Sequence, residues 1–520
     1  MNHSFKKCCA CLLVLAVLVS SFALSASAEV RGTRVPTVYL GGYGGQIVAD
    51  KYDADSERLF SVTIPDDFAN TVIDRIKLPL LKGATLNQWD DFHREVIDLT
   101  VGIYGSFALD NNGEASDGSG HPAYLHTYPL PENKADYYDL YSYYFEYDWR
   151  LDPFENADLL SEYIDAVCEA TGYEKVNLAG RCLGVNIILA YVQSHGFDKV
   201  DQILCSAAGF NGFETIGALF TGEMDFNRDA IPDYLDHAGR AQMVGPDGNP
   251  TFDLVITLLE ILSATKSLNI TDAVFDHYLI PEFKQYILPE FMRKTYATLP
   301  GFWSFIGEEY YDEAMQTIFG GYEEEYAGII KKADHYHYDV MLHVEDILQD
   351  AIAQGTEVYI IAKYGARMVP IIKDADTQSD STVFTSNSSL GATTAPLYGS
   401  FSDDFVSGVK TANGGKYLSP DRQIDASTCL LPDHTWFIKN LYHHEVPDSM
   451  EWMMAEILDF DGYTTINDLE AYPQYLVFSH ETSLITPMPA DEPASQAPKY
   501  SFFKKLIELF KLIFQVLKNR

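Results

Sequence analysis

The sequence predicts an α/β protein built on a mostly parallel β-sheet. Strand-like and helix-like segments alternate from Tyr141 to Ala207, which is the order that a parallel sheet with helices on both faces produces. Within this region an apolar, β-branched strand at residues 176–179 turns directly into an apolar helix. A further strand of the same kind follows at residues 357–362, after a long helical region.

Composition and charge narrow the class of protein. The chain has 520 residues, of which 47% are hydrophobic and 21% are charged, as in a globular protein with one large core or two domains. Lys and Arg number 36 against 75 Asp and Glu, so the net charge is -39. Phosphates would be repelled by this charge, which argues against a nucleic acid as partner.

The N-terminal residues 1–28 have the features of a secretory signal peptide. Lys6 and Lys7 provide the basic start, residues 11–24 form a short apolar run, and residues 26–28 make a small-residue cleavage site. We therefore expect a secreted or cell-envelope-associated protein.

Four cysteines remain after the signal peptide, at positions 168, 182, 205 and 429. No two of them form a Cys-x-x-Cys pair, so we expect no metal site and no cofactor. A disulfide framework is not expected in a protein of this size. Cys168 and Cys205 lie in apolar stretches that are typical of core cysteines.

The first strand, Thr37 to Leu40, leads into a glycine-rich loop at residues 41–45. Residues 50–100 have apolar positions near helical spacing and are predicted to be helical. Residues 110–120 are rich in Asp, Asn, Ser and Gly and predict a surface turn.

An aromatic strand beginning at Tyr141 ends in a polar group, Tyr147-Asp148-Trp149-Arg150. Pro153 then opens a helix that runs to about Ala170. We expect Arg150 to bind a carboxylate with both arms of its guanidinium while Trp149 packs beneath it, a structural role.

Gly180-x-Cys182-x-Gly184 joins the strand at residues 176–179 to the following helix. This is the G-x-S-x-G nucleophile elbow of the α/β-hydrolases, with a thiol in place of the hydroxyl. The glycines are needed because a side chain two residues to either side would collide with the neighbouring strand and helix. The helix N-terminus and Arg181 would both lower the pKa of the thiol.

Together the glycine loop, residues 147–150 and the elbow resemble the lecithin:cholesterol acyltransferase-like lipases of the α/β-hydrolase superfamily. The resemblance covers about half of the mature chain, in blocks. It implies an α/β-hydrolase fold with a mostly parallel sheet and a helical cap, and Cys182 as the nucleophile. It also implies that the N–H groups of Tyr43 and Leu183 hold the oxyanion.

The triad acid is expected after a late strand. Ser379-Asp380-Ser381-Thr382-Val383 resembles the family's Asp-Gly-Thr-Val segment, with Ser381 in place of the glycine. This favours Asp380, and Asp374 and Asp376 remain rivals, with Asp376 as the second choice.

The triad histidine should lie on a loop before a final helix, which the sequence predicts at residues 449–458. His434, His443 and His444 all precede that helix. His443 fits best because it follows a strand, and His444 is the second choice.

Six segments are predicted along the chain. They are the signal peptide (1–28), the first part of the hydrolase core (29–213), a helical cap (214–354), the second part of the core (355–484), a Pro/Ala-rich linker (485–499) and an amphipathic tail helix (500–520). The cap helices are expected at residues 252–267, 303–319, 326–334 and 344–353, and a plain helical subdomain is the alternative for this region.

The tail helix at residues 500–520 has a wide apolar face and a basic polar stripe. Such a helix suits a membrane surface, with the apolar face among acyl chains and the lysines at anionic headgroups. Docking into a groove on the same protein or on a partner is the alternative.

The order of Cys182, Asp380 and His443 in the chain is the order of nucleophile, acid and base in α/β-hydrolases. The sequence therefore predicts an enzyme that cleaves or transfers the acyl group of a lipid-like or small-molecule ester. The alternative is a hydrolase-fold binding protein at the cell surface that has lost turnover. Cys182, Gly41 and Ser381 depart from the family pattern in the way that this alternative would allow.

Overall fold

The structure is a computed structural model of the chain. It describes residues 35–53, 55–59, 68–122, 142–225, 230–243, 280–459 and 463–497, together with a few residues between 253 and 260. The predicted signal peptide, the tail helix at 500–520 and most of the predicted helix at 252–267 lie outside the described residues.

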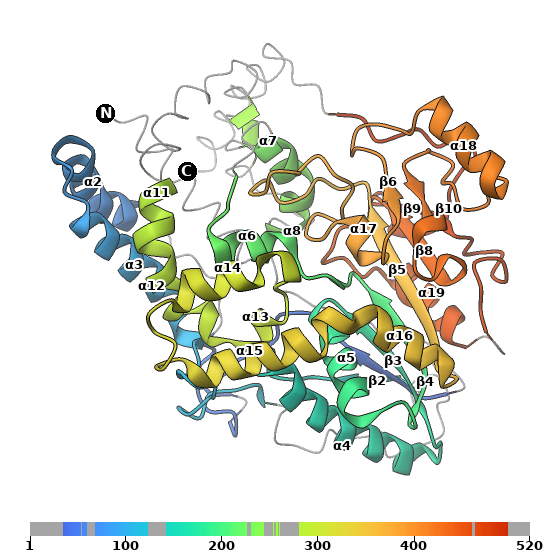
Figure 1. The fold of residues 1–520 in the computed structure, drawn as a ribbon, viewed down its shortest axis with the longest axis horizontal. Helices are drawn as coiled ribbons and strands as arrows, with labels where there is room; N and C mark the ends of the chain where they lie inside the picture. The colour runs from blue at the N-terminus through green and yellow to red at the C-terminus, as the bar shows by residue number, and fades with distance from the viewer. Residues whose placement is uncertain are drawn as a thin grey trace, which may run out of the picture.

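An eight-stranded sheet forms the centre of the protein (Figure 1). Its strands follow the order β10-β9-β8-β5-β4-β3-β1-β2, and every neighbouring pair is parallel except β9 with β10. The strands are β1 (Thr37–Leu40), β2 (Ser142–Phe145), β3 (Val176–Arg181), β4 (Val200–Ser206), β5 (Glu357–Tyr364), β8 (Thr435–Lys439), β9 (Tyr475–Ser479) and β10 (Leu484–Pro487). A separate pair joins β6 (Thr393–Thr394) to β7 (Ile424–Asp425). The mostly parallel α/β fold predicted from the sequence is confirmed.

Helices cover the sheet and extend beyond it at both ends of the molecule (Figure 1). Those before β5 are α2 (Phe68–Leu86), α3 (Asp90–Tyr104), α4 (Pro153–Thr171), α5 (Leu183–His195), α6 (Glu214–Thr221), α7 (Ala230–Tyr234), α8 (Arg240–Met243), α11 (Ile280–Glu282), α12 (Leu288–Arg293), α13 (Pro300–Trp303), α14 (Glu308–Phe319), α15 (Ala327–Asp339) and α16 (Val344–Ala353). Those after β5 are α17 (Thr385–Ser388), α18 (Asp403–Asn413) and α19 (Asp448–Leu458). In the part of the chain that the structure describes, no helix is long and apolar enough to cross a membrane.

The alternation of side chains along the strands divides the core into two layers. Leu178 and Ile360 belong to the cluster on the α5 side of the sheet, whereas their neighbours Ala179 and Ile361 belong to the cluster on the α19 side. Both faces of the central strands are apolar because both are covered by helices. The helix α16 packs against α5 and β5 and so covers a face of the sheet.

Local sequence explains the ends of α4. The Asp152 carboxylate accepts the Phe154 N–H, Pro153 occupies the first helical position, and Gly172 ends the helix with φ 78°. Its backbone N–H closes on the Cys168 carbonyl, which satisfies one of the last free acceptors of the helix. These local signals place the helix between β2 and β3 as the sequence predicts.

The polar group after β2 forms a buried ion pair. Arg150 is fully buried, and its Nε and Nη2 donate to the two carboxylate oxygens of Asp148 at 3.0 and 2.8 Å. Its Nη1 donates to the Phe107 carbonyl and the Ser119 hydroxyl. Trp149 packs edge-on against Tyr43 with the ring centroids 4.4 Å apart. The expected structural role of Arg150 is confirmed, and its carboxylate lies two residues away in the chain.

Two helical predictions are corrected. Residues 50–53 and 55–59 form turns, in which Asp50 and Asp53 accept nearby backbone N–H groups, and the described helix begins at Phe68. The predicted helix 303–319 begins only at Glu308, as α14, and Trp303 is the last residue of the preceding helix α13. Gly307 lies at the break and contacts the backbone of Asn211 so closely that a Cβ there would lie 2.0 Å from the Asn211 carbonyl oxygen.

The predicted linker at 485–499 is also corrected over its described part. Leu484–Pro487 forms β10, the antiparallel edge strand of the sheet. Further along, the Pro493 carbonyl accepts from Lys439 Nζ at 2.6 Å, and the Ser495 N–H donates to Gln423. Composition predicted an extended segment, but pairing to β9 and to buried polar side chains holds it on the protein.

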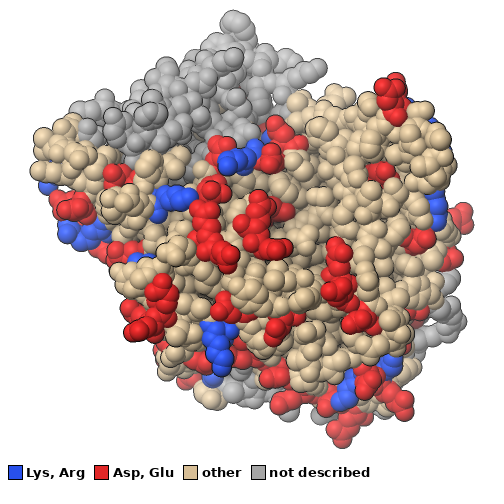
Figure 2. Space-filling model, viewed as in Figure 1, with Lys and Arg blue, Asp and Glu red and all other residues tan. Residues whose placement is uncertain are grey.

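Acidic side chains greatly outnumber basic ones on the face shown in Figure 2. This distribution agrees with the strongly negative net charge of the chain.

Candidate functional site

Three loops meet at the carboxyl ends of neighbouring strands. Cys182 follows β3, Asp380 lies in the segment after β5, and His443 follows β8. The carboxyl ends of parallel strands lie at one edge of a sheet, where α/β proteins bind their ligands. The structure therefore brings together three side chains that are far apart in the sequence.

Cys182 stands on a strained turn between β3 and α5. Its φ and ψ are 53° and -122°, a conformation that non-glycine residues rarely adopt. A Cβ at Gly184 would lie 2.5 Å from the Leu40 carbonyl oxygen, and one at Gly180 would lie 2.7 Å from Ile188. The two glycines are required because the turn presses α5 against β1 and against its own strand.

The imidazole of His443 lies between Asp380 and Cys182. Its Nδ1 is 2.7 Å from Asp380 Oδ2, and its backbone N–H donates to the Asp380 carbonyl at 2.7 Å. The other ring nitrogen, Nε2, is buried and has no hydrogen bond of ordinary geometry within the described residues. The ring also faces the Cys182 sulfur closely enough to interact with its charge.

Asp380 is fully buried, and a turn holds its second oxygen. Oδ1 accepts the backbone N–H groups of Thr382 and Val383, both at 2.9 Å. The intervening Ser381 has φ 86°, in the region that favours glycine. This backbone conformation explains why a glycine would suit this position, which serine occupies here.

Electrostatics favour a charged pair between Cys182 and His443. Burial alone would raise the pKa of the thiol, but His443, the Tyr43 N–H and Arg181 together hold it below the usual value. Burial alone would lower the pKa of His443, but Asp380 and the Cys182 sulfur raise it to about 9. Both shifts favour the thiolate–imidazolium pair over the neutral thiol and imidazole.

The glycine loop after β1 closes one side of the sulfur. A Cβ at Gly42 would lie 2.9 Å from the Cβ of Cys182, so this position must be glycine for the loop to approach. The backbone N–H of Tyr43 forms a hydrogen bond to the sulfur. Leu183 is the first residue of α5, directly after the nucleophile. Both residues predicted to supply oxyanion donors thus belong to elements that adjoin Cys182.

The rival acidic residues lie elsewhere. The Asp376 side chain is 70% exposed and pairs with Arg367. Asp374 accepts the Thr377 N–H through its backbone carbonyl. Neither makes a contact with His443 among the described interactions.

The rival histidines also have other surroundings. His444 stacks on Tyr442 with the ring centroids 6.4 Å apart, and burial lowers its pKa to about 4. His434 packs edge-on against Tyr463. His443 is therefore the histidine that the structure brings to Cys182 and Asp380.

Aromatic side chains form one wall of the site. The Phe213 ring meets the His443 ring edge-on, with centroids 5.8 Å apart, and Phe305 packs against Phe213 at 4.7 Å. Tyr43 packs edge-on against Phe302. The aromatic wall is apolar, whereas the Glu214 carboxyl lies close enough to Asp380 for their charges to interact.

Two cations that the sequence analysis did not connect with the histidine lie behind its loop, the fully buried Lys363 and the partly buried Arg181. Arg181 Nη1 donates to the His444 carbonyl at 3.0 Å, and Lys363 Nζ donates to several carbonyls of the same loop. Arg181 was noted only as a neighbour of the thiol. A sequence signal for Lys363 exists, because it is a single charge at the carboxyl end of the otherwise apolar stretch 358–364.

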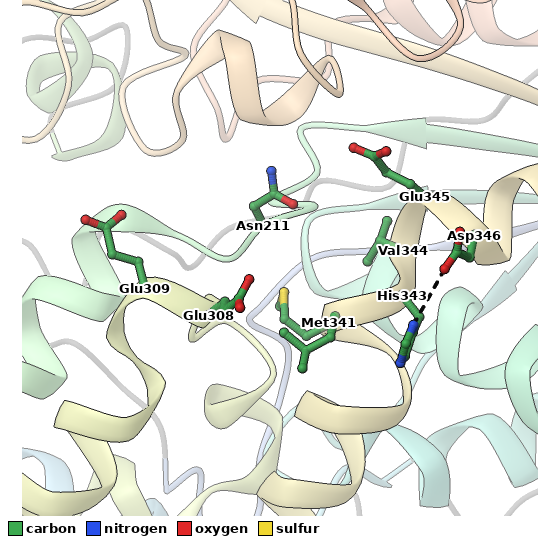
Figure 3. Close-up of a pocket in the computed structure, with 9 residues that line it drawn as sticks. Asn211, Glu308, Glu309, Met341, His343, Val344, Glu345 and Asp346 are labelled. Atoms are coloured by element: carbon green, nitrogen blue, oxygen red, sulfur yellow. Dashed lines mark ion pairs between the residues drawn. The ribbon is translucent and has the colours of Figure 1, made fainter.

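A cavity of about 410 Å³ lies between the N-terminal ends of α14 and α16 (Figure 3). It is lined by Asn211, Glu308, Glu309 and residues 341–346, so its polar groups are mostly acidic. None of the three triad residues lines it. We therefore do not include this cavity in the candidate site.

The chain matches no known protein-family model and no curated protein sequence.

Proposed function

We propose that the protein is an enzyme of the α/β-hydrolase type, which cleaves or transfers the acyl group of a lipid-like ester through Cys182, His443 and Asp380. The observation that carries the proposal is the buried contact of His443 with Asp380 on one side and with a strained elbow cysteine on the other. The chain order also supports it, because the nucleophile, the acid and the histidine follow β3, β5 and β8 in the order that is typical of that superfamily.

In the first half of the proposed reaction, the Cys182 thiolate attacks the ester carbonyl carbon. The N–H groups of Tyr43 and Leu183 hold the oxygen that becomes negative. The His443 imidazolium gives its Nε2 proton to the departing alcohol, and a thioester to Cys182 remains. Asp380 keeps the imidazole ring oriented and stabilises its positive charge.

In the second half, water or another alcohol attacks the thioester while His443 accepts its proton at Nε2. The acyl group leaves as a free acid or as a new ester, and the proton on His443 restores the charged pair with the thiolate. The aromatic wall formed by Phe213 and Phe305 supports an apolar acyl group as substrate, because such a wall offers few hydrogen bonds.

The test is ester cleavage by cysteine variants. We expect Cys182→Ala to lose at least about a hundredfold in kcat/KM on a short chromogenic ester, and Cys182→Ser to retain part of the activity. Cys205→Ala is the matched control, because Cys205 is a buried thiol on the adjacent strand β4 whose pKa is raised by burial to about 12.

A thiol-reactive probe at neutral pH separates the proposal from a binding protein without turnover. We expect rapid labelling of Cys182 and slow labelling of Cys205. Full ester cleavage by Cys182→Ala, or equally slow labelling of both thiols, would contradict the proposal.

A further inference from the structure

The loop that carries His443 is held from behind by two cations, of which Lys363 is fully buried and Arg181 is partly buried. Lys363 Nζ, at the end of β5, donates to the carbonyl oxygens of Tyr442, His443 and Glu445 at 3.0, 3.2 and 2.7 Å. Arg181, at the end of β3, donates to the remaining carbonyl, that of His444. Each backbone carbonyl from 442 to 445 is therefore bound by a cation at the carboxyl end of another strand of the sheet.

The side chain of Lys363 is fully buried, which is costly for a charged group. Its three ammonium hydrogens match the three carbonyl acceptors, so the contact satisfies the donors completely. Buried charges generally contribute less to stability than apolar residues of similar volume would. The buried charge of Lys363 is therefore better explained by a role in positioning the loop of His443 than by a contribution to the free energy of unfolding.

We propose that Lys363 is a positioning residue of the candidate site, whose ammonium fixes the loop 442–445 so that His443 lies between Asp380 and Cys182. This inference rests on the triad of the proposed function. Lys363 touches none of the reacting atoms and acts through the loop and through its charge.

Several charged or titratable groups face the ammonium. Asp380 and Glu445 attract it, Arg181 repels it, and the Cys182 thiolate attracts it; His443 and His444 lie on the loop that it binds. Burial lowers the pKa of Lys363 to about 7, although Asp380 opposes this shift. The ammonium is charged below that pH, so its support of the thiolate is present at pH 6 and fades as the pH rises above 7.

The test measures the rate at which iodoacetamide alkylates Cys182 as a function of pH, which requires no ester turnover. We expect Lys363→Met to slow alkylation about tenfold at pH 6, because removing the ammonium raises the pKa of the thiol. The alkylation rates of Lys363→Met and of the wild type should converge above pH 8, where the amine of Lys363 in the wild type is neutral. A purely structural defect would instead slow the reaction by a similar factor at every pH.

Lys439→Met is the matched control. Lys439 is also a buried lysine at the end of a neighbouring strand, β8, and also donates to a backbone carbonyl, that of Pro493. Its partners, Asp421 and Glu492, are not part of the site. We expect its alkylation profile to match that of the wild type.

If Lys363→Met does not fold, Lys363→Arg tests whether Lys363 is a positioning residue. Arginine keeps its charge at every pH, but its planar head does not match three convergent carbonyls. We expect Cys182 in Lys363→Arg to be alkylated more slowly than in the wild type at pH 6. The plot of its alkylation rate against pH should show no change of slope near pH 7. A wild-type profile in either folded variant, a uniform loss across pH in Lys363→Met, or loss of folding in both variants would overturn the proposal. Unchanged ester cleavage by Cys182→Ala would instead contradict the proposed function and leave this result standing.

Discussion

Ser381 holds a backbone conformation that usually belongs to glycine. Its φ is 86°, and its hydroxyl is buried without a hydrogen-bond partner in the described structure. Both features oppose folding, because an L-residue with this φ is strained and an unpaired buried hydroxyl loses its hydration. The turn persists because Asp380 Oδ1 binds two backbone N–H groups across it.

Replacing Ser381 by glycine should therefore stabilise the protein. We expect Ser381→Gly to raise the free energy of unfolding by about 1 kcal/mol, after the entropy that glycine adds to the unfolded chain is subtracted. Ser381→Ala is the control, because it removes the hydroxyl and keeps the strained Cβ. Urea unfolding measures both, and a lower midpoint for Ser381→Gly than for the wild type would contradict the argument.

The charged pair of Cys182 and His443 sets the expected pH dependence of activity. The thiolate is lost at low pH, below the depressed pKa of the thiol, and the imidazolium proton needed by the leaving alcohol is lost as pH rises through about 9. We expect kcat/KM to follow a bell-shaped curve whose upper limb lies near pH 9.

Cys182→Ser is the comparison for this prediction. A serine hydroxyl does not ionise, so His443 must be neutral to accept its proton, and the residual activity should rise with pH where the wild type begins to fall. Measured pH profiles of the two proteins on one ester decide the point. Parallel profiles would show that no thiolate–imidazolium pair operates.

At the scale of secondary-structure elements, the segment between β2 and α4 depends on one buried ion pair. Asp148 and Arg150 are almost fully buried, and Arg150 also donates to Phe107 and Ser119. Removing the cation leaves a buried carboxylate without its partner, which is much more costly than the pair is stabilising.

We expect Arg150→Met to lower the free energy of unfolding by about 3–5 kcal/mol. The control is Arg422→Met, which removes an ion pair to the 92% exposed Asp403 and should change stability by no more than about 1 kcal/mol. Urea unfolding of the two variants gives the comparison. Equal losses would show that burial of the Asp148–Arg150 pair has no energetic consequence.

At the scale of the whole molecule, the acidic body and the basic C-terminal segment differ sharply in charge. The net charge of the chain is -39, whereas residues 500–520 contain Lys504, Lys505, Lys511, Lys518 and Arg520. An anionic membrane would repel the body and attract this segment, at about 1 kcal/mol for each basic residue near the surface. The described chain is still bound to the protein at Ser495, whose N–H donates to Gln423.

We predict that the full-length protein co-sediments with anionic vesicles and that a chain ending at Pro498 does not. Binding should weaken with added salt, because exposed charges are screened, and should be weaker on vesicles of neutral lipids. Equal sedimentation of the two proteins, or of neither, would contradict the membrane prediction and favour docking of the segment on protein.

Local sequence patterns determined the strand at residues 176–179, the elbow after it and the ends of α4. The run of apolar and β-branched residues at 176–179, the glycines at the elbow and the capping residues of α4 act within one or two turns of the chain, so their consequences follow from neighbouring residues alone. The alternation of strands and helices likewise determined a parallel sheet, because the connections between parallel strands must cross one face of it. The elbow cysteine was therefore identifiable before any tertiary contact was known.

Only the tertiary structure decided which acid and which histidine meet that cysteine. Asp380 and His443 are 63 residues apart in the chain. Their rivals Asp376 and His444 lie within a few positions of them in loops, where hydrophobic periodicity does not tell which way a side chain points. The same holds for Lys363, which becomes part of the site through carbonyl groups about 80 residues away. Side-chain direction at the end of a strand depends on how the following loop packs against its neighbours, and those contacts are long-range.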